Sequence, residues 1–355
     1  MLDLFSQAYK GKKVFVTGDS GFKGSWLCIW LLELGADVYG YSLPPLTSKA
    51  NYTTSDLQNK IHHIDGDIRY KEKLQSFISE IKPDIAFHLA AQPLVIDSYN
   101  NPHYNFETNL MGTVNFFEAI RNCNSIKAAI NVTTDKCYKN KEWIWGYREN
   151  EAMGGDDPYS ASKACSELIT HSYIESFFSK ENTANVSSAR SGNVIGGGDW
   201  ADSRILADLI KAYQSDQTLI IRNPQAVRPW QFVLEPLYGY LKLGEKLISE
   251  GKPFSGGWNF GPSSYQNYSV SDVIQKVKEM LPTIKIIFLS SNEKFHEAEL
   301  LKLDISKAVN ILGWKPKLNF EQSIRMTIEG YLHEIEQPNA VYDFRVEQIK
   351  KYCQT

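Results

Sequence analysis

Short runs of β-branched and aromatic residues alternate with longer amphipathic segments through the first half of the chain. The short runs predict strands at residues 13–17, 37–41, 61–64, 84–89, 127–132 and 186–189. The amphipathic segments predict helices at residues 26–34, 70–80, 104–121 and 159–178. This βαβ alternation indicates an α/β fold with a Rossmann-type, doubly wound parallel sheet.

The pattern changes after Gly192, where a glycine-rich loop is followed by short elements and many aromatic residues. We therefore expect a nucleotide-binding Rossmann domain at residues 1–190 and a smaller, mainly substrate-binding C-terminal lobe at residues 191–355. The boundary is soft, because a return of the chain to the main sheet is expected. Ligands of such sheets bind beyond the carboxyl ends of the strands. Gly18, Ala90, Thr134 and Arg190 follow or end predicted strands, so we expect them to converge.

Composition narrows the function classes. The 355 residues are 43% hydrophobic with a formal charge of −3, which allows a sizeable core and gives no sign of nucleic-acid binding. The apolar runs are shorter than the ~18 residues that would span a bilayer, and the N-terminus lacks a secretory pattern. Five scattered cysteines without a Cys-x-x-Cys pair are typical of reduced thiols in a cytoplasm. His62-His63 and His296-Glu297 lack metal-ligand spacing, so no metal site is expected.

The first candidate for chemistry is a glycine-rich turn between the first strand and the first helix. Gly18, Gly21 and Gly24 have the spacing Gly-x-x-Gly-x-x-Gly. Glycines let the backbone approach a pyrophosphate, and the helix N-terminus offers free N–H groups. Asp19 places a negative charge inside the turn, and Lys23 is expected to offset it.

The second candidate is the sequence Tyr-Ser-Ala-Ser-Lys, which sets Tyr159 and Lys163 four residues apart. On a helix they share a face. A phenol has a pKa near ~10, and a neighbouring ammonium is expected to lower it. The pair can then take a proton from a sugar hydroxyl while a hydride leaves for a nicotinamide ring. Thr134-Asp135-Lys136 follows a predicted strand and should lie nearby.

Further segments join these motifs, at residues 88–95, 134–138, 140–155, 192–200, 221–224, 228–231 and 258–261. With them, nearly the whole chain resembles the extended short-chain dehydrogenase/reductase family, and most of all its CDP-glucose 4,6-dehydratase branch. The resemblance implies an NAD-dependent hydro-lyase, a lyase that converts CDP-glucose to CDP-4-keto-6-deoxyglucose and water. It also implies a place in deoxysugar biosynthesis, as for lipopolysaccharide O-antigen, and a cytoplasmic homodimer or higher homo-oligomer paired through the two long helices.

The implied reaction has three stages. Tyr159 deprotonates the glucose 4-hydroxyl as C4 is oxidised, water is lost across C5 and C6, and the hydride returns to C6. Thr134 would hydrogen-bond the sugar 4-oxygen, and Asp135 would protonate the departing hydroxyl. Lys136 stands where the broader family has a glutamate base. Since an ammonium cannot accept a proton, the role of Lys136 stays open.

The resemblance also assigns binding positions. The cofactor positions are Gly18, Gly21, Phe22, Lys23, Gly24, Ser42, Asp67, Ile68, Leu89, Ala90, Ala91, Thr108, Tyr159 and Lys163. The substrate positions are Gln92, Asn193, Arg204, Arg222, Arg228 and Trp230. Arg190 joins the three other arginines as a candidate diphosphate clamp, with a surface or lobe-pairing role equally open.

Two points remain open at this stage. Ser42, and not an acidic residue, ends the second predicted strand, so NAD is favoured over NADP by the resemblance alone. A 4-epimerase of the same superfamily would share Tyr159 and Lys163 without needing Asp135 and Lys136 for elimination. A catalytically silent nucleotide-binding module is the alternative from another class, and the intact catalytic residues count against it.

Overall fold

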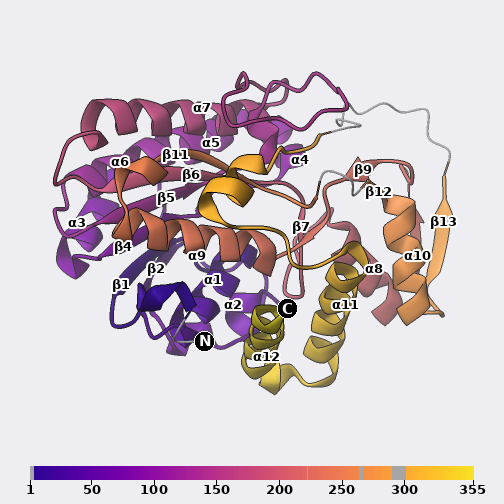
Figure 1. Cartoon of the computed structure of the whole chain (residues 1–355). Coiled ribbons are helices and arrows are strands. Elements are labelled where there is room, and N and C mark those ends of the chain that lie inside the picture. The colour runs from indigo at the N-terminus through magenta and orange to yellow at the C-terminus, as the bar shows by residue number, and fades with distance from the viewer. Residues whose placement is uncertain (1–3, 222, 264–266, 290–300) are drawn as a thin grey trace.

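A parallel sheet of seven strands forms the core layer of the larger lobe, on the left in Figure 1. The structure is a computed structural model that describes residues 4–221, 223–263, 267–289 and 301–355. In spatial order the strands are β11 (Gly256–Phe260), β6 (Asn185–Ser191), β5 (Ala128–Val132), β4 (Ile85–His88), β1 (Lys13–Thr17), β2 (Asp37–Ser42) and β3 (His62–Asp65). The order reverses between β1 and β4, which creates the crevice where such sheets bind ligands. The predicted Rossmann-type fold is confirmed.

Helices cover both faces of this sheet. One face carries α3 (Lys71–Ile81), α6 (Gly112–Arg121) and α7 (Pro158–Tyr173), and the other carries α1 (Phe22–Glu33) and α9 (Leu234–Ser249). Val14 and Val16 pack into the apolar cluster on the α1 side, whereas Phe15 packs into the opposite cluster. Successive strand side chains point to opposite faces, so a strand covered on both faces is apolar throughout.

Two of the predicted helices contain a wider turn. The segment predicted at 104–121 consists of α5 (Pro102–Phe106), the π-helical turn η3 (Glu107–Met111) and α6. The segment predicted at 159–178 is α7 followed by the π-helical turn η5 (Ile174–Phe178). Such turns are frequent at functional sites, and η3 buries Thr108 and Asn109 beside the end of β4.

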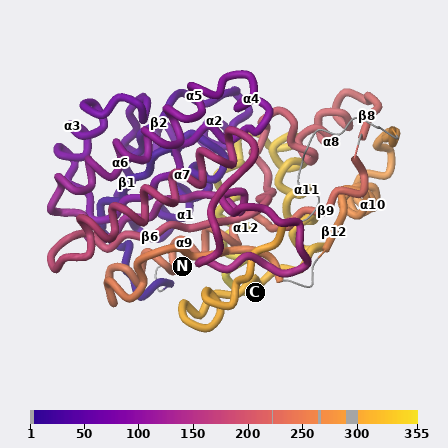
Figure 2. Tube along the Cα trace, turned by 90° about the horizontal axis from the view of Figure 1, so that it is seen from above, coloured from indigo at the N-terminus to yellow at the C-terminus, as the bar shows by residue number. Residues whose placement is uncertain are grey.

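A second lobe lies beside the sheet (Figure 2). Its helices are α8 (Ile205–Gln214), α10 (Val270–Met280) and α11 (Phe320–Glu336). Its strands form three pairs, β7 (Val194–Ile195) with β10 (Gln231–Phe232), β9 (Val227–Arg228) with β12 (Tyr268–Ser269), and β8 (Thr218–Ile221) with β13 (Lys285–Phe288). The lobe has its own apolar cluster, which includes Leu209, Val273 and Ile324.

The second half of the chain also contributes a strand to the main sheet and a helix beside it. Strand β11 pairs with β6 in the main sheet, and α12 (Val341–Gln354) packs against α1. The short helices α2 (Asn51–Thr54) and α4 (Val95–Asn100) complete the α-helical elements of the described chain. The division at residue 190 stays a prediction. Within the described residues, no helix has the length and apolar character needed to cross a membrane.

Candidate active site

The glycine-rich turn lies at the carboxyl end of β1 and leads directly into α1. Gly18 has a φ of 74°, and a Cβ there would lie 2.7 Å from the backbone nitrogen of Ala90. A Cβ on Gly24 would lie 2.0 Å from the Gly18 oxygen. Gly21 is the N-cap of α1, and a Cβ there would meet only the Gly18 oxygen, at 3.2 Å, among the described residues. The turn therefore needs glycine twice and leaves the helix N-terminus open, as a pyrophosphate site requires.

The charge of Asp19 is balanced differently from the prediction. Its buried carboxylate contacts the His63 ring, with Oδ2 2.7 Å from Nδ1. The side chain points toward β2, where a Cβ on Gly40 would lie 2.2 Å from Oδ2. Burial lowers the pKa of His63, but Asp19 and Asp65 outweigh burial and raise it above its ordinary value. The prediction that Lys23 offsets Asp19 is wrong, because the missing side chain of Gly40 lets Asp19 reach His63.

Lys23 instead faces the ends of the central strands. Its Nζ donates to the Ser191 hydroxyl across 3.3 Å. Burial, followed by the charges of Lys163 and Arg204, lowers the pKa of Lys23 to about 7. Lys23 therefore lies in electrostatic reach of the predicted catalytic lysine.

The predicted adenosine side is built from short hydrogen bonds. The hydroxyls of Ser42 and Ser20 lie 2.8 Å apart, which ties the end of β2 to the glycine turn. The Asp67 carboxylate is paired with Arg69, with Oδ2 2.6 Å from Nη2. Burial raises the pKa of Asp67, but its hydrogen bonds to Arg69 leave the pKa below its ordinary value. Ile68 is buried against Gly112.

The end of β4 lies next to the glycine turn. The Ala90 N–H donates to the Thr17 hydroxyl across 3.2 Å. This hydrogen bond holds Ala90 and its neighbours Leu89 and Ala91 next to the end of β1. Oε1 of Gln92 and Oγ1 of Thr108 lie near the end of β4 and are buried without a hydrogen-bond partner among the described residues. Buried polar groups are rarely left unpaired in a folded protein, so these two atoms indicate a polar ligand.

Tyr159 and Lys163 lie in the first two turns of α7, where Asp157 caps the helix by accepting from Ser160 N at 2.9 Å. Both side chains are buried. The Lys163 ammonium reaches the carbonyl oxygen of Val132 at 3.5 Å. Burial lowers the pKa of Lys163 to about 8.

Burial also raises the pKa of the Tyr159 phenol to about 12. A hydrogen bond with the Thr134 side chain and the charge of Arg204 act in the opposite direction without overcoming burial. The expected lowering of the phenol pKa by Lys163 is therefore wrong for the protein alone. At neutral pH the phenol is protonated, and only its phenolate form, which Thr134 and the Arg204 charge stabilise, can accept a proton.

The segment after β5 forms one turn of 3₁₀ helix, η4 (Asp135–Cys137), capped by Thr134. The Thr134 hydroxyl donates to Oδ1 of Asp135 across 3.0 Å. Asp135 is buried, and burial raises its pKa. A carboxyl held toward its protonated form is suited to act as an acid.

A cavity joins Asp135 to the predicted substrate residues. It is lined by Asp135, Lys136, Asn193, Val227, Arg228, Pro229 and Leu301. Arg204 forms an ion pair with Asp199, with Nε 3.7 Å from Oδ2. Its positive charge acts to lower the pKa values of Tyr159 and Lys23. The acid, Lys136 and two predicted substrate contacts thus share one site beyond the strand ends.

Other predicted contacts are placed elsewhere. Arg190 is buried and paired with Glu167, with Nη2 2.7 Å from Oε2, so of the roles left open for it the diphosphate clamp is the one that the structure contradicts. Trp230 is buried in the second-lobe cluster and donates its indole N–H to the Tyr268 oxygen across 2.9 Å. The indole N–H is thus already paired within the lobe, and the substrate contact of Trp230 stays a prediction. Arg222, His296 and Glu297 lie outside the described residues.

The structure also adds residues that the predictions omitted. Ser98 accepts from the Tyr159 backbone N–H across 3.2 Å, and Asn109 bonds both backbone groups of Gln92. Glu167 follows Lys163 by four residues on α7 and faces the same interior. Its helical spacing was the signal available in the sequence, because Tyr159, Lys163 and Glu167 recur at intervals of four.

Comparison with known proteins gives one family and several relatives. Residues 15–327 match the family model described as GDP-mannose 4,6 dehydratase. The chain is 47% identical over 327 residues to a CDP-glucose 4,6-dehydratase of Salmonella typhimurium, covering 91% of each protein. It is 26% identical to a dTDP-glucose 4,6-dehydratase of Xanthomonas campestris, covering 94% of this chain and 97% of the relative. A structure of UDP-glucuronic acid 4-epimerase from Bacillus cereus, in complex with UDP-glucuronic acid and NAD, is similar with a TM-score of 0.77 at 22% identity, covering 91% of this chain and 99% of that one.

Proposed function

Because this chain belongs to the GDP-mannose 4,6-dehydratase family, we propose that it is an NAD-dependent nucleotide-sugar 4,6-dehydratase, a hydro-lyase, acting on CDP-glucose. The choice of CDP follows the relative that is 47% identical over 91% of the chain, against 26% for the dTDP-glucose relative. The observation that carries the reaction type is that Thr134, whose side chain lowers the pKa of Tyr159 against burial, donates to Asp135 across 3.0 Å. Tyr159, the acid–base group for oxidation at C4, therefore lies close to the buried Asp135 carboxyl, the acid for the loss of water. A 4,6-dehydratase needs both groups.

The glycine turn and its surroundings fit a dinucleotide. Gly18 and Gly24 permit the tight turn, and Gly21 leaves the start of α1 open. At the same edge, Thr108 and Gln92 each have a buried side-chain oxygen with no hydrogen-bond partner in the described part of the chain. These residues would hold NAD, with Ser42 and Asp67–Ile68 toward its adenosine half. When bound, NAD supplies the hydride acceptor for C4 and the donor for C6.

At C4, the residues of this chain remove the proton of the sugar 4-hydroxyl. Tyr159 takes it from the sugar 4-hydroxyl and Thr134 orients the same oxygen. Only the phenolate of Tyr159 can take this proton, and burial disfavours the phenolate at neutral pH. The fraction of phenolate therefore depends on the groups that stabilise it, which are the Thr134 side chain and the Arg204 charge. The Lys163 ammonium, whose pKa of about 8 keeps it largely charged at neutral pH, is available for the same purpose.

At C5 and C6, Asp135 gives its proton to the departing hydroxyl. Burial raises its pKa, which favours the protonated acid in the folded protein. Lys136 lines the same cavity and is our candidate for the C5 proton, a role that requires its neutral amine. Asn193 and Arg228 line this cavity as well, and we assign them, with Arg204, to the sugar and the diphosphate.

We further propose a homodimer paired through the faces of α5–α6 and α7. Met111 in η3, Leu168 in α7 and Phe177 in η5 expose between 40% and 57% of their surface, so large apolar side chains on this side are available to pack against a second copy. A reducing, cytoplasmic location is supported by five free cysteines, none of them in a disulfide. The product of the proposed reaction would be an intermediate of deoxysugar biosynthesis, and we expect this pathway to supply lipopolysaccharide O-antigen.

One experiment tests the proposed activity directly. Purified protein is incubated with CDP-glucose, and the product is examined by mass spectrometry for the loss of one water. Parallel incubations with dTDP-glucose, UDP-glucose and GDP-mannose test the choice of nucleotide. Conversion of CDP-glucose alone, or at the highest kcat/KM, supports the proposal. A product that keeps all its oxygens and is inverted at C4 would replace the dehydratase with an epimerase.

A further inference from the structure

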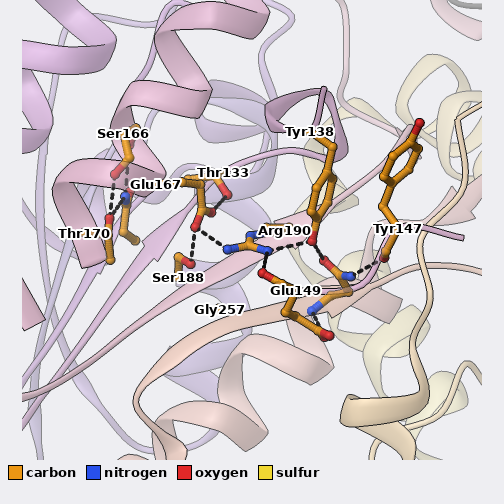
Figure 3. A network of polar contacts seen from close by, with 12 residues as sticks. Thr133, Tyr138, Tyr147, Glu149, Ser166, Glu167, Thr170, Ser188, Arg190 and Gly257 are labelled. Atoms are coloured by element: carbon orange, nitrogen blue, oxygen red, sulfur yellow. Dashed lines mark hydrogen bonds and ion pairs between the residues drawn. The ribbon is translucent and has the colours of Figure 1, made fainter. Parts of the chain in front are cut away.

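A buried network of polar side chains surrounds Glu167 and Arg190 (Figure 3). Its centre is Glu167 on α7, of which 4% is exposed. Oε1 accepts a short hydrogen bond from the Thr133 hydroxyl. Oε2 accepts from the Ser188 hydroxyl across 2.6 Å and from Nη2 of Arg190 across 2.7 Å. One carboxylate therefore joins α7 to β6 and to the end of β5.

Arg190 extends this network to the opposite side. Its Nη1 donates to the Tyr138 hydroxyl across 2.6 Å and to the Glu149 carbonyl oxygen across 3.0 Å. The Tyr138 hydroxyl in turn donates to Oδ1 of Asn259 on β11 across 2.7 Å. A Cβ on Gly257 would lie 2.4 Å from Nη2, so β11 has the space that the guanidinium fills. The loop after η4 and strand β11 are thus tied to the same ion pair.

The network connects the two halves of the proposed chemistry. Helix α7 carries Tyr159 and Lys163, and Thr133 immediately precedes Thr134 and Asp135. We propose that Glu167 is a positioning residue of the reaction, fixing the Thr134–Asp135 turn against α7 through Thr133 and setting a negative charge beside the Lys163 ammonium. The inference rests on the proposed dehydratase function for its kinetic consequence, but not for its electrostatic one.

The charges around Lys163 support the electrostatic part. Burial raises the pKa of Glu167, but Arg190, Ser188 and Thr133 together bring it below its ordinary value, so the carboxylate is ionised. Glu167 in turn raises the pKa of Lys163 against the effect of burial.

The other groups facing Lys163 come from three further elements. They are Lys23 on α1, His88 on β4 and Cys137 on η4. Burial and then Lys163 lower the pKa of His88 to about 3, and burial raises the pKa of Cys137, so both are neutral at physiological pH. The Glu167 carboxylate, on the same helix, is therefore the negative charge that favours the protonated form of Lys163.

The test replaces Glu167 by Gln, which keeps the shape and removes the charge. We expect kcat for CDP-glucose to fall about 10²-fold, the effect of a displacement on the order of 1 Å, while KM changes little. Because Lys163 loses the anion that raises its pKa, the alkaline limb of the kcat–pH profile should move to lower pH. Thr133→Val keeps the Glu167 charge and breaks only the tie to β5, so it should lower kcat without moving that limb.

Glu235→Gln is the matched control. Glu235 is also a buried carboxylate with three donors, the N–H groups of Lys317 and Leu318 and the Tyr352 hydroxyl, but it lies on α9 outside the site. It should lower the melting temperature without changing the pH profile. If Glu167→Gln behaves like Glu235→Gln, with an unmoved alkaline limb, Glu167 has only a structural role and the inference fails.

A second measurement needs no substrate. In protein labelled with ¹³C at the lysine ε-carbons, the Lys163 resonance is assigned by its loss in Lys163→Met and titrated by NMR. We expect its titration to move to lower pH in Glu167→Gln and to stay in place in Thr133→Val. An unmoved titration overturns the inference even in a protein that does not dehydrate CDP-glucose, so that the failure of the proposed function and the failure of this inference are distinguished.

Discussion

Replacing Asp135 by Asn separates the oxidation step from the elimination step. Asp135 is 3% exposed, and its Oδ1 accepts from Thr134 across 3.0 Å. Asparagine keeps the volume and one acceptor oxygen, so the net cost to folding should be about 1 kcal/mol, that of one altered hydrogen bond. The amide cannot supply a proton to the departing 6-hydroxyl. Loss of a positioned acid typically slows its step ~10²-fold, which is about 2.7 kcal/mol of barrier.

The assay is a single turnover with CDP-glucose, followed at the absorbance band of reduced nicotinamide. Tyr159, Lys163 and the glycine turn are unchanged, so oxidation at C4 should proceed and reduced cofactor should accumulate before slow dehydration. Asp272→Asn is the control, since Asp272 lies in the capping box of α10, outside the cavity-lining set, and undergoes the same chemical change. Dehydration by Asp135→Asn at the parent rate would remove Asp135 from the elimination step and refute this reasoning.

Three further predictions follow from the geometry. Tyr159→Phe should slow oxidation at C4 by at least ~10²-fold with an unchanged near-ultraviolet circular dichroism spectrum, and an active variant would contradict the role of the phenol. Gly18→Ala should purify with less bound NAD, because its Cβ would collide with Ala90 N, whereas Gly11→Ala shares the positive φ but has open space and should keep its NAD. The pKa of His63 is raised in the folded state, so its pairing with Asp19 should stabilise the fold below pH ~6.5 and lose that effect as pH rises through the folded pKa. Asp19→Asn should flatten this dependence in thermal unfolding between acidic and neutral pH, and an unchanged slope would contradict the pairing.

The sequence predicted the central strands of the sheet well because they are buried on both faces. The run at 13–17 is apolar or β-branched almost throughout and ends at a glycine with positive φ, so strand and turn were both visible. The π-helical turn at Glu107–Met111 was not predicted, because its residues continue the helical pattern on either side. Its existence depends on the packing of Asn109 against Gln92 and Ser162, which one-dimensional periodicity does not record.

The pKa shifts and ion pairs of the site were harder to predict than the identity of its residues. The sequence brought Tyr159 and Lys163 together, but the sign of the phenol pKa shift depends on burial, which reverses the effect expected from a neighbouring cation. For Arg190 the sequence left a diphosphate clamp and a surface or lobe-pairing role equally open. Its partner Glu167 lies 23 positions earlier, and only the pairing of β6 with β5 under α7 brings them together.

Transfer of a labelled hydrogen within one substrate molecule tests the central claim most directly. CDP-glucose carrying deuterium at C4 is converted by the parent protein, and the product is examined by NMR and mass spectrometry. A 4,6-dehydratase that recycles its cofactor should give CDP-4-keto-6-deoxyglucose, lighter by one water, with the deuterium at C6 and no net release of NADH. A product that retains every oxygen with C4 inverted, or stoichiometric release of deuterated NADH, would contradict the account.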